Sequence, residues 1–291
     1  MFSIIIPLYN KADYIAETLK SVLNQTYCDY EVIVVNDSST DNSLEVASSF
    51  QDERIHIYTK ENEGVSAARN YGIMHAKYDY IAFLDADDIW ESDYLECQKK
   101  LIEIYPDAGI YSTAFYSLEK GKRKLRNVLI NEHTHFLVHD YFKESVMNGL
   151  SICWTSSLCL KKEVIKEIPM FRVGIKRGED LDLWLRIALN YDVAYLNLPK
   201  VFYRTGLSDS LTSDYSKNGE FPYYEWFNFT SESSYYRKYV ILVVYIHAKN
   251  AFIHHDYDTC LAELWSVKTI AWRFKWAERL LLLVISWIKS K

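Results

Sequence analysis

Three predominantly apolar segments constrain the fold of this chain more than any other feature. They comprise residues 2–7, 31–35 and 80–84, and each is followed by polar residues. Continuous apolar runs rich in β-branched residues are typical of central strands in a parallel sheet that helices cover on both faces. With a further strand expected over 54–59, these segments predict the sheet of an α/β protein.

Helical patterns separate the predicted strands. Helices are expected over residues 10–24, 42–50 and 64–76, and in the first of them Ile15 and Leu19 fall on one apolar stripe. Strands that alternate with helices of this length form βαβ units with right-handed crossovers. We therefore expect an α/β fold with a mostly parallel central sheet flanked by helices.

Polar residues follow three of the strands, over 7–10, 36–40 and 85–88. The carboxyl ends of parallel strands share one edge of a sheet, where ligands bind. Carboxylates crowded in the last segment repel one another unless a cation lies among them, and a hard divalent cation that carries phosphate oxygens suits such ligands. The alternative is a solvated loop that caps the next helix. The shared edge favours the metal and nucleotide site.

A second acidic cluster, Glu179 and Asp180, begins a predicted helix whose apolar stripe includes Trp184. Acidic residues in a first turn are also favoured by the helix dipole alone, so this position does not require a function. Trp184 and Trp154 could stack on sugar rings, but their places on apolar stripes favour the core.

The sequence predicts that the whole chain divides into two regions. Residues 1–218 form the α/β domain, with halves at 1–118 and 119–218, and residues 219–291 form a C-terminal helical extension. The remaining expected elements are a helix over 92–105, a strand over 108–118, an exposed basic hairpin or loop over 119–127, a strand over 151–161, and helices over 162–168, 235–251 and 259–291.

Composition excludes several classes of protein. The formal net charge of −6 on 291 residues leaves no basic stripe for nucleic acid. Five cysteines, without Cys-x-x-Cys spacing, indicate a reducing compartment. No secretory signal is expected, and no apolar run reaches the roughly 20 residues of a spanning helix. These features predict a cytoplasmic protein.

The segment 269–291 combines tryptophans and aliphatic residues with lysines and arginines. Such a composition suits a helix that lies in a membrane interface, which would place the protein peripherally on the cytoplasmic face. The alternative is an amphipathic helix that packs on the domain or on a second subunit of a homo-oligomer.

Five segments, taken together, resemble the family 2 glycosyltransferases of the GT-A fold. They are Ile4–Asn10, Val35–Asp41, Asn62–Asn70, Phe83–Asp88 and Gly178–Asp180. The resemblance implies an inverting, metal-dependent hexosyltransferase with a nucleotide-sugar donor, UDP-sugar being favoured. It also implies a glycan or lipid-linked acceptor in surface polysaccharide biosynthesis.

The resemblance also assigns roles to residues around the donor. Asp37 would accept hydrogen bonds from the base. Asp87 would bind Mn²⁺ or Mg²⁺ directly, and Asp85 would hold either the ribose or the water shell of this metal. The full set that would contact the nucleotide is Pro7, Tyr9, Asn10, Asp37, Ser66, Arg69, Asp85 and Ala86.

On the acceptor side, the resemblance implies that Asp180 is the general base, with Glu179 as the substitute for that role. Family members often carry Tyr-Arg-x-His after the base-bearing helix. This chain has Tyr203-Arg204-Thr205-Gly206, so the histidine is missing. The site would then work with fewer protein ligands, or residues 205–214 would supply an oxygen.

Two other classes of protein compete with this interpretation. A sugar nucleotidylyltransferase would need a glycine-rich loop after its first strand, and none follows Pro7. A non-catalytic GT-A-like partner or scaffold subunit of a glycan-assembly complex is weakly favoured by the missing histidine. The intact Asp85, Asp87 and Asp180 argue against it.

Overall fold

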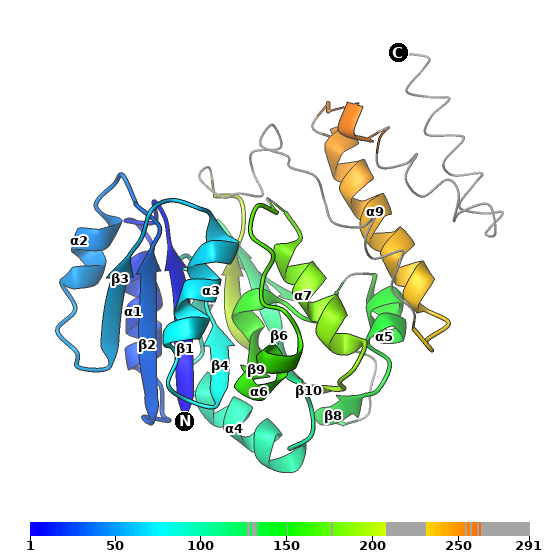
Figure 1. Cartoon of the computed structure of the whole chain (residues 1–291), viewed down its shortest axis with the longest axis horizontal. Coiled ribbons are helices and arrows are strands. Elements are labelled where there is room, and N and C mark those ends of the chain that lie inside the picture. The colour runs from blue at the N-terminus through cyan, green and yellow to red at the C-terminus, as the bar shows by residue number, and fades with distance from the viewer. Residues whose placement is uncertain are drawn as a thin grey trace.

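A single ten-stranded sheet with helices on both faces forms the body of the protein (Figure 1). The computed structural model describes residues 1–126, 129, 133–149, 151–175, 177–207, 231–253, 255–256, 258–260 and 262. The strand order is β3-β2-β1-β4-β9-β6-β10-β5, with β7 beside β6 and β8 beside β10. The α/β architecture expected from the sequence is therefore confirmed.

The N-terminal half of the sheet is parallel, as predicted. β1 pairs with β2 and β4, and β2 pairs with β3, all in parallel. The strands are β1 (Phe2–Leu8), β2 (Tyr30–Asn36), β3 (Ile55–Thr59) and β4 (Tyr80–Phe83). Every residue of β1 and β2 is buried, which explains their predominantly apolar sequences; the buried Ser3 donates a hydrogen bond to the buried Glu31 at 2.6 Å.

Helices cover both faces of this half and separate the core into two layers. One layer lies under α1 (Ile15–Leu23), α2 (Ser43–Ser48) and α4 (Tyr94–Ile104). The other lies under α3 (Val65–His75), α6 (Lys162–Glu167) and α7 (Glu179–Ala188). The alternation of side chains along each strand divides the apolar residues between these layers, so that Ile4 and Ile5 belong to different ones.

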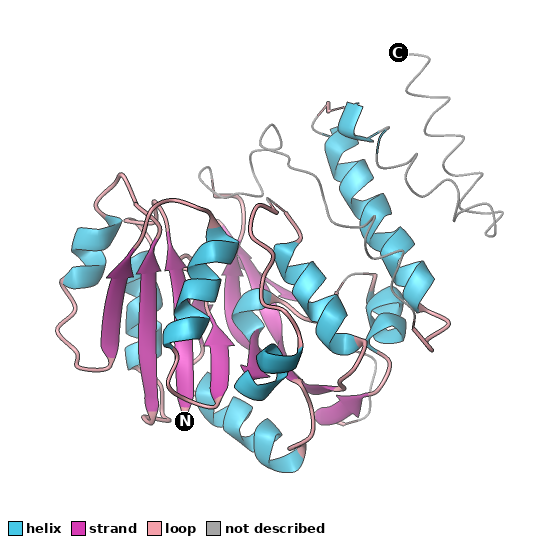
Figure 2. Cartoon of the chain, viewed as in Figure 1, coloured by secondary structure: helices cyan, strands magenta, loops and turns pink. Residues whose placement is uncertain are grey.

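The second half makes the sheet mixed overall (Figure 2). β9 is antiparallel to β4 and β6, whereas β10 is parallel to β6 and antiparallel to β5 and β8. The strands are β5 (Ile89–Trp90), β6 (Ile110–Glu119), β8 (His135–Val138), β9 (Leu158–Lys161) and β10 (Val193–Arg204). β7 (Lys122–Arg126) pairs with β6 and is fully exposed, which confirms the basic hairpin.

One predicted strand is half wrong, and four further elements were not predicted. Residues 155–157 form the 3₁₀ helix η1 (Thr155–Ser157), and the strand over 151–161 is reduced to β9. Hydroxyls favour such turns because they bond to nearby backbone, as Ser157 Oγ does to the Trp154 carbonyl at 3.0 Å. The four unpredicted elements are β5, β8, β10 and α5 (Tyr141–Asn148).

The predicted helix over 235–251 is confirmed as α9 (Tyr236–Ile253). It packs on α5, where the Tyr141 and Tyr239 hydroxyls are 3.0 Å apart and the Phe142 and Tyr236 ring centroids are 4.8 Å apart. The predicted helix over 259–291 lies almost wholly outside the described residues. Within the part of the chain that the structure describes, no helix is long and apolar enough to cross a membrane.

Candidate active site

The loops after β1, β2 and β4 meet at the carboxyl edge of the sheet. The backbone N–H of Asp37 donates to the Leu8 carbonyl at 2.9 Å, and the backbone N–H of Leu84 donates to the Ile5 carbonyl at 3.1 Å. Asn10 has a φ of 51°, a conformation that asparagine tolerates, and its side-chain oxygen accepts from the Thr40 N–H at 2.8 Å. The predicted convergence of three strand ends is thus present.

Asp37 organises the start of α3. Its buried carboxylate accepts from the Lys60 ammonium at 2.9 Å and from the backbone N–H groups of Glu63 and Gly64 at 3.2 and 2.8 Å. Gly64 precedes the helix with a φ of 91°, which favours glycine. Asp37 therefore fixes the loop between β3 and α3, with its charge balanced by Lys60.

Ser66 and Arg69 lie on the buried side of α3. The Ser66 hydroxyl has no hydrogen-bond partner among the described residues. Arg69 donates from one terminal nitrogen to Asp85 and from the other to Glu179, both at 2.8 Å. A planar guanidinium can bind two carboxylates in this way, one through each terminal nitrogen. Arg69 thereby joins the acidic residues after β4 to the first turn of α7.

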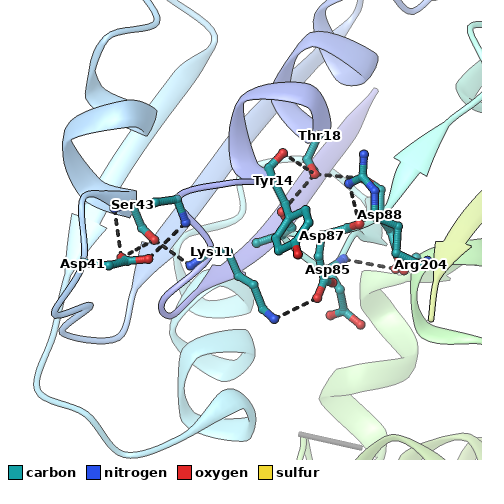
Figure 3. A network of polar contacts seen from close by, with 12 residues as sticks. Lys11, Tyr14, Thr18, Asp41, Ser43, Asp85, Asp87, Asp88 and Arg204 are labelled. Carbon is teal, nitrogen blue, oxygen red and sulfur yellow. Dashed lines mark hydrogen bonds and ion pairs between the residues drawn. The ribbon is translucent and has the colours of Figure 1, made fainter. Parts of the chain in front are cut away.

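Residues 85–88, the acidic loop, are held to three other elements through Asp88 (Figure 3). The carboxylate of this fully buried residue accepts from the Ser156 hydroxyl at 2.5 Å and from the Arg204 N–H at 3.0 Å. Thr18 in α1 donates to the backbone carbonyls of Ala86 and Asp88 at 2.9 and 2.8 Å. Burial, reinforced by the charges of Asp87 and Asp85, raises the pKa of Asp88 well above its usual range. Asp88 is therefore a structural anchor of the loop.

Asp85 and Asp87 remain accessible, with side-chain exposures of 27% and 15%. Asp87 pairs with the Lys11 ammonium at 3.0 Å, as Figure 3 shows. Burial raises the pKa of the Asp87 carboxyl; Lys11 opposes this shift and the Asp85 charge adds to it. Lys11 was not predicted as a site residue; it directly follows Asn10, the last residue of a segment that carries the family resemblance.

The residues of the acidic loop fit a divalent cation that binds together with phosphate groups. Asp85 and Asp87 offer hard carboxylate oxygens, the ligands that Mg²⁺ and Mn²⁺ prefer. Across the residues that are described, no group of three or more His, Cys, Asp or Glu side chains forms a metal site. One or two carboxylates plus substrate phosphates is the usual arrangement for Mg²⁺ in such sites.

The two acids of α7 have different environments. Glu179 is buried against Arg69, and burial together with the neighbouring Asp180 charge raises the pKa of Glu179 to about 7. Asp180 is partly exposed, and its carboxylate accepts from the Thr155 hydroxyl at 3.0 Å. The more accessible of the two carboxylates is therefore that of Asp180.

The remaining predicted residues lie around this edge or in the core. Pro7 is buried within β1, whereas Tyr9 is 45% exposed at its end. Trp184 is fully buried, as favoured from the sequence, and Trp154 packs on Tyr203 with centroids 4.6 Å apart. Gly206 replaces the family histidine with a φ of 73°, a left-handed conformation that suits glycine.

Comparison with known proteins identifies a family. The model described as "Glycosyl transferase family 2" matches residues 3–168. TuaG of Bacillus subtilis, named as a teichuronic acid biosynthesis glycosyltransferase, is 32% identical over 67% of this chain and 75% of its own length. An uncharacterized glycosyltransferase of Rickettsia felis is 36% identical over 64% of this chain, which spans only 30% of that relative.

Solved structures agree on the fold. S. aureus TarS 1–349 in complex with UDP-GlcNAc superposes with a TM-score of 0.72 at 19% sequence identity. The likeness covers 90% of this chain and 79% of the TarS chain. At this level of identity it is a statement about architecture.

Proposed function

Because the chain belongs to glycosyl transferase family 2, we propose that it transfers a sugar from a UDP-sugar to a hydroxyl of a glycan or lipid-linked acceptor in surface polysaccharide biosynthesis. The observation that carries this proposal is the Arg69 bridge, which brings the acidic loop and Asp180 to one edge of the sheet. A donor-binding group and a candidate base on adjacent elements are what sugar transfer requires.

On the donor side, Asp85 and Asp87 would hold Mn²⁺ or Mg²⁺ against the diphosphate. The bound cation supplies Lewis-acid stabilisation of the departing nucleoside diphosphate. Lys11 places a further positive charge beside Asp87, where phosphate oxygens would lie. The loops that carry Pro7, Tyr9, Asn10 and Asp37 would hold the nucleoside, with Ser66 beside the diphosphate.

On the acceptor side, Asp180 would accept the proton of the attacking hydroxyl as general base. Attack opposite the leaving group in a single displacement inverts the anomeric centre, so an α-linked donor would give a β-glycoside. The burial of Glu179 against Arg69 supports Asp180 over Glu179 in this role.

Two similarities support the choice of donor and pathway. The TarS structure contains UDP-GlcNAc, which supports a UDP-sugar here. TuaG is named for teichuronic acid biosynthesis, which supports a surface polysaccharide. Because the chain spans 30% of its relatives in Rickettsia felis and Rickettsia conorii, the activity of those whole proteins is not carried over.

The test is turnover of a panel of UDP-, GDP- and dTDP-sugars, with and without Mn²⁺. We expect metal-dependent turnover of a UDP-sugar and its loss in Asp87→Ala, whereas Asp107→Ala, which removes an exposed acid after α4, should behave as wild type. Asp180→Asn should bind donor normally and lose transfer. Normal turnover by Asp180→Asn would refute the base assignment, and no turnover by the wild type would favour the non-catalytic partner subunit.

A further inference from the structure

The short helix η1 contacts both halves of the candidate site. Its three residues are almost wholly buried, and they lie between Trp154 and β9. Thr155 faces α7 and Ser156 faces the acidic loop, as their hydrogen bonds show. Consecutive residues of one rigid turn therefore contact the donor side and the acceptor side.

Ser156 holds the acidic loop in place. Its hydroxyl accepts from the Asp85 N–H at 3.1 Å and donates to the Asp88 carboxylate at 2.5 Å. Its carbonyl accepts from the Trp90 indole N–H at 2.7 Å. The position of Ser156 relative to the loop is thus fixed by three hydrogen bonds.

Thr155 makes one polar contact with the candidate base. Its hydroxyl donates to Oδ2 of Asp180 at 3.0 Å, and Oδ1 accepts from the backbone N–H of Leu181 at 2.7 Å. The two donors approach different oxygens, so they fix the rotation of the carboxylate as well as its place. A general base acts only when its lone pair points at the proton that it removes.

We propose that Thr155 is a positioning residue that orients the Asp180 carboxylate relative to the acidic loop. This inference rests on the proposed function, because it requires that Asp180 be the base. Arg69 provides an independent connection between the loop and α7, through Asp85 and Glu179. Loss of the Thr155 hydroxyl should therefore disturb the orientation of Asp180 without separating the two elements.

The experiment compares Thr155→Val with Thr155→Ser in the full chain. Valine keeps the branched shape and removes the hydroxyl, whereas serine keeps the hydroxyl. The control is Ser157→Ala, which removes a buried hydroxyl of the same turn whose partners among the described residues are the Trp154 carbonyl and the Ser112 hydroxyl. Each variant is assayed for turnover of the UDP-sugar that the wild type uses, with water as acceptor, and for UDP affinity with Mn²⁺ by calorimetry.

We expect Thr155→Val to lower kcat about tenfold to a hundredfold. Its affinity for UDP should be unchanged, and its melting temperature should be near that of Ser157→Ala. Thr155→Ser should recover most of kcat. Wild-type kcat in Thr155→Val, together with loss of turnover in Asp180→Asn, would overturn this inference alone. Full turnover in Asp180→Asn, or none in the wild type, would overturn the proposed function and this inference with it.

Discussion

Arg69 shows how one residue sets the electrostatics of the candidate site. Its guanidinium is buried and contacts carboxylates from two elements that lie 94 positions apart in the sequence, Asp85 and Glu179. Both terminal nitrogens are used in these contacts, and Nε has no hydrogen-bond partner among the described residues. In this state Arg69 acts as a bridge, and a role beside the diphosphate stays a prediction.

Glu179 predicts a pH dependence of stability. Its pKa is raised from 4.5 to about 7, first by burial and then by Asp180. The pKa of this carboxyl is higher in the folded than in the unfolded protein. Such a group stabilises the fold fully when the pH is below the unfolded-state pKa, and this stabilisation is lost as the pH rises through the folded-state pKa. We therefore expect Glu179→Gln, which still offers Arg69 an acceptor, to lose less stability than wild type between pH 4.5 and about 7.

The measurement is the melting temperature at several pH values across this window. Glu53→Gln is the matched control, since it removes an exposed carboxyl in the turn before β3. Its pH dependence should follow that of the wild type. If Glu179→Gln also follows the wild-type curve, then Glu179 does not titrate in this range.

At the scale of elements, the acidic loop depends on the end of β10. Arg204, the last residue of that strand, donates from its backbone to Asp88 and from its guanidinium to the Asp87 carbonyl at 2.7 Å. The same guanidinium forms an ion pair with Glu17 of α1. β10 and α1 therefore both contact the loop, through Arg204 and Thr18 (Figure 3).

We expect Arg204→Ala to weaken binding of UDP in the presence of Mn²⁺ by about tenfold, because one hydrogen bond from a charged donor to the loop is lost. The backbone bond to Asp88 is retained, so the fold should persist. Calorimetric titration measures the affinity. Arg123→Ala is the control, because Arg123 in β7 lies over the Phe202 ring and has no contact with the loop. Equal affinities for both variants would show that the Arg204 side chain does not support the loop.

The parallel half of the fold was predictable because its strands are buried on both faces. β10 was not, since Asn197, Pro199 and Lys200 interrupt any regular pattern, and its pairing with β6 shifts register twice there. The turn at Thr155–Ser157 carries no periodic signal either. Local sequence patterns thus identify strands whose apolar composition follows from burial in the core. They miss strands, such as β10, whose position depends on pairing with neighbouring strands.

The same distinction holds for the site. The acids after β4 stood out because carboxylates end an apolar strand at the edge shared with two other polar strand ends, whereas the roles of Glu179 and Asp180 came from the family resemblance. Lys11, Thr155 and Ser156 were missed because their partners Asp87, Asp180 and Asp88 lie at least 25 positions away. A lone threonine or serine in a sequence does not indicate which carboxylate it will contact.

At the scale of the whole molecule, the C-terminal region begins as part of the core. Tyr239 and Val240 of α9 are fully buried in the same apolar layer as α3 and α7, and Tyr239 bonds to Tyr141 of α5. Cutting the chain near residue 218 would uncover this surface. A cut after residue 268 keeps α9 and removes the predicted interfacial segment 269–291, so it isolates the function of that segment.

We expect the full chain to sediment with liposomes that contain anionic lipid, and the chain cut after residue 268 to remain in the supernatant. Tryptophans and aliphatic residues enter the interface, while each basic residue near an anionic surface adds about 1 kcal/mol. Neutral liposomes and high salt should both reduce binding, because the electrostatic contribution is screened. The alternative outcome is that the full chain does not sediment with liposomes and that removal of residues 269–291 converts a dimer to a monomer. In that case residues 269–291 form a subunit contact. That result would be compatible with the proposed sugar transfer, but it would contradict the proposed location of the protein at the membrane.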